Sequence, residues 1–85
     1  MVILHTDIND NMERKYNYLE KVIVLSNVHL KELEISGCSG TILGFDFVDG
    51  NWIYSIDIKG KEVLYSISEL DIITTGEYDD EAKYY

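Results

Sequence analysis

Apolar and polar positions alternate along residues 40–71 in three runs that two short turns separate. The turns are Asp49-Gly50-Asn51 and Lys59-Gly60-Lys61, and an Asp-Gly pair between apolar runs is a strong hairpin signal. In the middle run the large apolar side chains occupy alternate positions, which share one face of a strand: Trp52, Tyr54, Ile56 and Ile58. The pattern predicts antiparallel strands over residues 41–47, 52–58 and 62–67.

Two further strands are expected on either side of these runs. A continuous apolar run at residues 22–25, rich in β-branched residues, predicts a strand over residues 18–26 that is covered on both faces. Ser68 is placed to cap a single helical turn over residues 69–71, and a short last strand follows at residues 72–75 and ends at Gly76. Within the second strand, Gly44 predicts a bulge or a sharp bend.

The remaining segments are less regular. Residues 1–15 are interpreted as an N-terminal arm or an extra strand or turn, with one helical turn near residues 12–15 as an alternative. Between residues 28 and 35 the leucines fit one or two helical turns, or an irregular loop over the core. Residues 77–85 form an acidic tail that is expected to fray.

Five short strands with tight turns, and one helical turn before the last strand, are typical of an SH3-like barrel. We therefore expect a mainly β fold, a five-stranded antiparallel SH3-like barrel over residues 16–76 with one short helical or 3-10 turn. An OB-type barrel or an open meander also fits five strands. At 85 residues the chain is long enough for one domain with a modest core.

Charge narrows the range of partners. The formal net charge is −9, and the second half of the chain, residues 44–85, holds ten acidic residues against three basic ones. Such a surface disfavours direct binding to nucleic acid, which needs cations to displace counterions, and it disfavours anionic membranes. The charge favours a basic partner, or it simply keeps the protein soluble.

The chain offers no recognisable chemistry. Cys38 is the only cysteine and has no histidine or basic neighbour that would activate it, and His5 and His29 lie far apart without cysteines at ligand spacing. We therefore expect no enzyme activity, no metal and no cofactor. A lone cysteine and the absence of a long apolar run predict a cytoplasmic protein that does not enter a membrane.

The candidate partner-binding residues are acids on or beside the hairpins, together with two strand aromatics, because Tyr and Trp are enriched at binding hot spots. They are Asp46, Asp49, Trp52, Asp57, Glu62, Tyr65 and Glu69. If these acids share one side of the sheet, they form a field that attracts a cationic protein. Core packing of the aromatics and a merely solvated acidic surface are the alternatives.

Several short motifs occur here in a characteristic order. They include a Gly-x-x-Gly turn at residues 37–40, Gly50-Asn-Trp-Ile-Tyr54, Ser68-Glu-Leu-Asp71 and Thr75-Gly76. This order resembles a family of small immunity proteins of bacterial polymorphic toxin systems, over residues 18–76. The family often has an extra aromatic residue in the fourth strand, where this chain has Leu64 and Tyr65, and residues 1–15 have no counterpart.

The resemblance implies a cytoplasmic protein with an SH3-like fold that binds and blocks a cognate toxin domain. The acidic charge suits a toxin with a basic surface, such as a nuclease. Two other functions remain open, an SH3-like protein-interaction adaptor and an acidic phage-type mimic of nucleic acid that inhibits a DNA-binding enzyme. Exposed edge strands leave both a monomer and a homodimer open.

Overall fold

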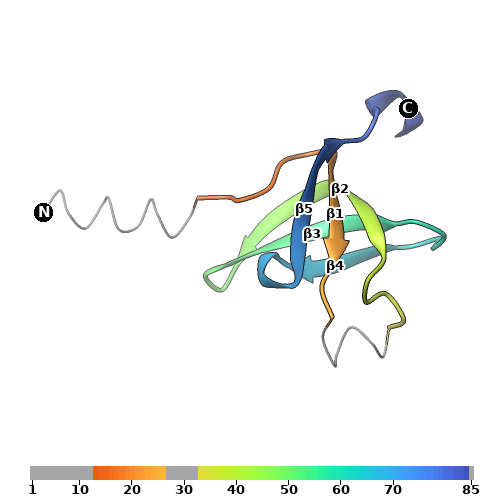
Figure 1. The fold of residues 1–85 in the computed structure, drawn as a ribbon. Coiled ribbons are helices and arrows are strands. Elements are labelled where there is room, and N and C mark those ends of the chain that lie inside the picture. The colour runs from red at the N-terminus through yellow and green to blue at the C-terminus, as the bar shows by residue number, and fades with distance from the viewer. Residues whose placement is uncertain (1–12, 27–32, 85) are drawn as a thin grey trace, which may run out of the picture.

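The computed structural model describes residues 13–26 and 33–84. Five antiparallel strands form one sheet in the order β4-β3-β2-β1-β5. The strands are β1 (Glu20–Val24), β2 (Ser39–Val48), β3 (Asn51–Ile58), β4 (Leu64–Ser68) and β5 (Ile72–Tyr78). The sheet curls so that β1 and β5 cross in front of β3 and β4 (Figure 1). Because no ladder joins β4 to β5 in the described part of the chain, the sheet does not close into a barrel.

These findings confirm the predicted mainly β fold. The two 3-10 turns are η1 (Glu69–Asp71), capped by the Ser68 side chain as predicted, and η2 (Glu81–Tyr84). The hairpin between β2 and β3 turns at Asp49 and Gly50, whose φ angles of 51° and 82° match the primed turns that suit the twist of a hairpin. The predicted bulge at Gly44 is present as a shift of register between Ile42 and Gly44.

The core lies on the inner face of the curled sheet. Alternate residues of β3 are fully buried there, as the pattern predicts, namely Tyr54, Ile56 and Ile58. Tyr16 and Ile35 join this core from segments outside the sheet. The apolar run of β1 was expected to be covered on both faces, and this is wrong. Val22 and Val24 are buried, whereas Ile23 on the outer face of the strand is exposed.

The last strand continues past its predicted end. Gly76 was expected to terminate it, but β5 continues to Tyr78 with Gly76 at a φ of 84°. The pairing with β1 shifts register there, and Thr75 Oγ1 donates a hydrogen bond to the Lys21 carbonyl oxygen at 2.9 Å. Glycine adopts this left-handed backbone without a steric penalty, so it allows the strand to bulge rather than stop.

Near the ends of the described chain, residues 13–15 and the C-terminal tail both contact the sheet. Residues 13–15 are not helical; they run along the inner face and lead into the buried Tyr16, while the rest of the predicted arm lies outside the described residues. The tail forms η2 and packs on the sheet. Most of the predicted helical segment at residues 28–35 is also outside the described residues. None of the helices described is long and apolar enough to cross a membrane.

Candidate partner-binding surface

The structure places the predicted contact residues at two opposite ends of β3. Asp46, Asp49 and Trp52 lie at or near the hairpin that joins β2 to β3. Asp57, Glu62 and Tyr65 lie at the other end, where β3 turns into β4. The length of one strand therefore separates the two groups.

Each of the two groups also has members on both faces of the sheet. Trp52 and Tyr65 pack against the core on the inner face. Asp46 and Asp57 alternate with inward-facing neighbours and point to the outer face, where Asp57 pairs with Thr41 of β2. Asp46 and Asp57 therefore share the outer face but lie at opposite ends of β3, so the predicted acids do not form a single cluster.

The Glu69 carboxylate is hydrogen-bonded to other residues of the protein. Its Oε2 accepts a hydrogen bond of 2.6 Å from the Tyr54 hydroxyl and one of 3.0 Å from the Lys15 backbone N–H. The same hydroxyl accepts a hydrogen bond from the Tyr16 N–H at 3.1 Å. Burial and the hydrogen bond to Glu69 both raise the pKa of Tyr54 above its usual value. Glu69 thus attaches residues 15–16 to the core and is not a free contact residue.

A cluster of half-exposed aromatic rings lies at the hairpin end of the inner face. Phe45 and Phe47 of β2 stand opposite Tyr54 and Trp52 of β3. The Trp52 ring lies 6.1 Å from the Phe45 ring in an edge-on arrangement and 5.1 Å from the tilted Phe47 ring, measured between ring centres. We call Phe45, Phe47 and Trp52 the aromatic shelf. Phe45 remains 37% exposed, so the shelf continues the core outward to solvent.

Arg14 lies on this shelf. Its guanidinium carbon is 3.7 Å from the centre of the Phe45 ring and 5.8 Å from that of Trp52, which is cation–π geometry. Of these residues, only Trp52 was predicted to contact a partner. The alternation of Phe45 and Phe47 opposite an aromatic strand was the available signal for the shelf. Nothing in the sequence pattern pointed to Arg14, because it belongs to a segment without periodicity.

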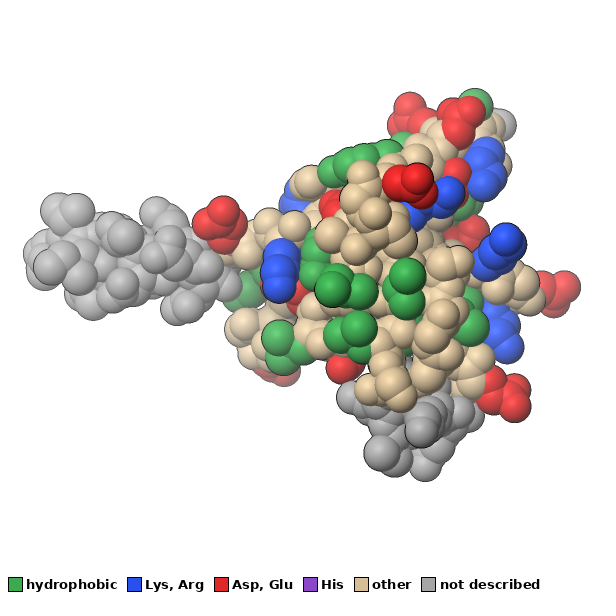
Figure 2. Space-filling view, in the orientation of Figure 1, with side chains coloured by type: hydrophobic (Ala, Val, Ile, Leu, Met, Phe, Trp, Pro, Cys, Tyr) green, Lys and Arg blue, Asp and Glu red, His purple; other side chains and the backbone are tan. Residues whose placement is uncertain are grey.

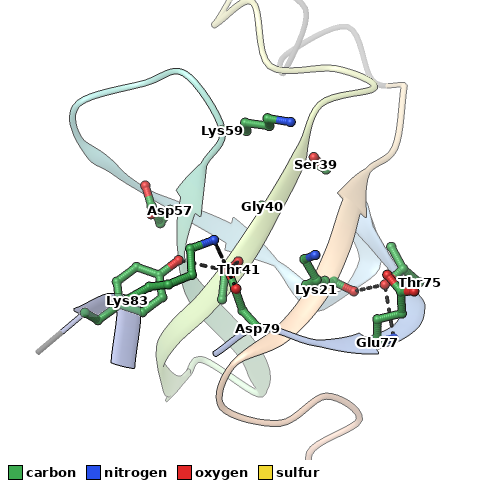
Figure 3. Close-up of a pocket in the computed structure, with 11 residues that line it drawn as sticks. Lys21, Ser39, Gly40, Thr41, Asp57, Lys59, Thr75, Glu77, Asp79 and Lys83 are labelled. Carbon is green, nitrogen blue, oxygen red and sulfur yellow. Dashed lines mark hydrogen bonds and ion pairs between the residues drawn. The ribbon is translucent and has the colours of Figure 1, made fainter. Parts of the chain in front are cut away.

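A groove occupies the outer face of the sheet, across β1, β2 and β3 and against the C-terminal segment (Figure 3). Its volume is about 550 Å³. Lys21, Lys59 and Lys83 line it together with Asp57, Glu77 and Asp79, so positive and negative groups are mixed. None of its lining residues is a histidine or a cysteine.

Asp79 closes one end of the groove by attaching the C-terminal turn to the sheet. Its carboxylate accepts hydrogen bonds from the Thr41 hydroxyl at 2.8 Å and the Tyr84 hydroxyl at 3.2 Å, and forms an ion pair of 3.1 Å with Lys83 (Figure 3). The Thr41 hydroxyl, followed by the Asp80 N–H, holds the pKa of Asp79 well below its usual range. The pairing with Asp79 correspondingly raises the pKa of Lys83.

The contacts of the Asp79 carboxylate predict that η2 detaches from the sheet in acid. Aspartate in an unfolded chain has a pKa of about 3.9. Because the folded pKa of Asp79 is lower, its stabilising effect is complete above that pH and is lost as the pH falls from about 4 towards the folded pKa. NMR signals of Ala82 and Lys83 should move to unfolded positions over this range. Asp79→Asn should detach the turn already at pH 7, whereas Glu77→Gln, the control, should not; retention of the turn in Asp79→Asn would contradict the assignment.

Within residues 13–26 and 33–84, no three His, Cys, Asp or Glu side chains are grouped so that they would hold a metal ion. Cys38 is a free cysteine, half-buried beside the core. Comparison of the chain with family models, with curated proteins and with solved structures gives no match in any of the three.

Proposed function

We propose that the protein is a non-catalytic inhibitor, an immunity protein that binds and neutralises a cognate bacterial toxin domain with a basic surface. The observation that carries this proposal is the aromatic shelf beside Arg14 in a protein of net charge −9. Trp is enriched among the residues that dominate binding energy, and half-exposed rings supported by a core lose little entropy on binding.

The surface composition supports a protein partner. Figure 2 shows one face of the molecule, on which hydrophobic side chains gather in the middle while acidic and basic side chains lie around the edge. Protein–protein interfaces have this organisation, with an apolar centre and a polar rim. The acidic excess would accelerate the encounter with a cationic partner.

The choice of a toxin as the partner rests on the sequence resemblance to immunity proteins over residues 18–76. A toxin of this kind acts inside the cell, so the inhibitor is placed in the cytoplasm under the same proposal. A nuclease is the toxin class that fits best, because a nuclease cleft is basic in order to hold its polyanionic substrate.

The phage-type mimic of nucleic acid is less well supported. Such a mimic needs carboxylates along one face at phosphate-like intervals. Asp46 and Asp57 do share the outer face, but Lys21, Lys59 and Lys83 line the groove beside Asp57. These cations interrupt the negative field. An SH3-like adaptor would use the same aromatic shelf, so its partner, and not its surface, distinguishes it from the inhibitor.

Co-expression with the toxin domain encoded beside this gene tests the proposal. We expect the protein to restore growth and to co-purify with the toxin, at an association rate that falls as salt rises. Trp52→Ala should weaken the complex about tenfold. The control is Val63→Ala, which shortens a side chain that is 60% exposed at the opposite end of β3. Failure to restore growth together with failure to bind would refute the proposed function.

A further inference from the structure

Arg14 occupies the aromatic shelf through contacts of its own segment. Its Nε donates a hydrogen bond of 2.8 Å to the Tyr16 carbonyl oxygen, and one Nη donates a longer one of 3.4 Å to the Asn17 side-chain oxygen. Tyr16 in turn is buried and fixed by the Tyr54 hydroxyl. The guanidinium is therefore held over the Phe45 ring, with the Trp52 ring beside it.

The geometry of the shelf suits a planar cation. Phe45 and Trp52 are inclined at 81° to each other, and the guanidinium carbon lies over the Phe45 ring at 3.7 Å from its centre. A ring face carries partial negative charge and attracts a cation, and guanidinium also stacks flat on such a face, which ammonium does not. The same features that accept Arg14 would accept an arginine from another protein.

Charge makes Arg14 an unfavourable contact residue for a basic partner. It is one of seven basic residues in a chain with sixteen acidic ones, and it covers the ring surface that a partner would otherwise bury. A partner that approaches the shelf meets a like charge at this position. Repulsion and competition both decrease if Arg14 moves away as the partner's arginine enters.

We propose that the aromatic shelf is an arginine-binding site, that Arg14 fills it in the free protein, and that an arginine side chain of the basic partner displaces Arg14 on binding. This inference rests on the proposed function for the identity of the partner. The arginine-binding site itself does not depend on that identity, because its ligand is defined only as an arginine side chain on a protein or peptide.

The test uses a capped Gly-Arg-Gly-Arg-Gly peptide as the probe and Trp52 as the reporter, because Trp52 is the only tryptophan in the chain. We expect saturable changes in Trp52 fluorescence and in its indole NMR signal. The same peptide with citrulline in place of arginine, which keeps the shape without the charge, should bind much more weakly. Equal binding of the two peptides would overturn the inference.

Two variants, Arg14→Ala and Lys15→Ala, test whether an incoming arginine displaces Arg14. Arg14→Ala should bind the arginine peptide about two- to fivefold more tightly, the range expected from the loss of one exposed cation–π competitor. Lys15→Ala removes the same charge one residue away, and its cation lies instead near the Tyr16 ring, so it should show little change. Weaker binding by Arg14→Ala, or an equal gain in both variants, would overturn the displacement of Arg14.

A third variant tests whether the Phe45 ring forms the arginine-binding site. Phe45→Leu keeps an apolar side chain and removes the aromatic face, so it should cancel the gain made by Arg14→Ala. The peptide titration does not require the toxin. Binding of the peptide without binding of the toxin would therefore count against the proposed function alone, and toxin binding that is unaffected by Arg14→Ala would count against the arginine site alone.

Discussion

Replacement of Ile72 by alanine is expected to lower the free energy of unfolding by about 2–5 kcal/mol, which is a large part of the stability of a domain this small. Ile72 is 3% exposed and belongs to the core on the inner face of β5. Truncation loses apolar burial and leaves a cavity that the surrounding strands fill only in part. Urea denaturation followed by circular dichroism measures the change.

Its neighbour provides a matched control. Ile73 has the same side chain on the same strand but points to the outer face and is 49% exposed. Ile73→Ala should cost about 1 kcal/mol or less, because little apolar surface returns to water. Equal losses in the two variants would contradict the assignment of the faces of β5.

Removal of the Tyr54 hydroxyl should have the next largest effect, with Tyr54→Phe lowering the free energy of unfolding by about 2–3 kcal/mol. The hydroxyl connects the Tyr16 N–H to the Glu69 carboxylate, so its loss leaves a buried donor and a partly buried carboxylate with fewer partners. The segment that carries Arg14 should then exchange its amide hydrogens faster. Hydrogen exchange monitored by NMR gives this second readout.

Tyr65→Phe is the control, since it removes a hydroxyl from the half-buried tyrosine of β4 and should be nearly neutral. Alkaline pH supplies an independent check. The raised pKa of Tyr54 means that its contribution is complete below about pH 10, the unfolded value, and is lost as the pH rises towards the folded value. A Tyr54→Phe protein as stable as the wild type would refute this role.

The strands were predictable because each sequence pattern that indicates them lies within a few neighbouring residues. Alternation along β3 identified the buried face, and Asp49-Gly50 identified the hairpin, since a two-residue turn with positive φ nearly requires such residues. The described segments on either side of the sheet were not predictable in this way. A few side-chain contacts across long sequence separations, such as Tyr16 to Tyr54 and Thr41 to Asp79, hold them in place.

The candidate surface was predictable only in part. Periodicity indicated that Trp52 lies on the inner face, but it gave no information on which acids lie near one another, because curvature and turns decide that. The acidic surface was therefore assembled from residues that the fold separates, and Glu69 was selected although it has internal partners. Arg14 was missed because its position on Phe45 depends on the path of a segment without regular structure.

The bulge in β5 has a consequence for self-association. An open sheet has two edges, and a molecule with two regular edges can add copies without limit and grow into a fibre. Here the shifted register around Thr75 and Gly76 distorts one edge, which leaves the five residues of β4 as the regular one. Pairing of β4 with the β4 of a second copy would use up this edge in both molecules. Strand addition at β4 would then close at two copies.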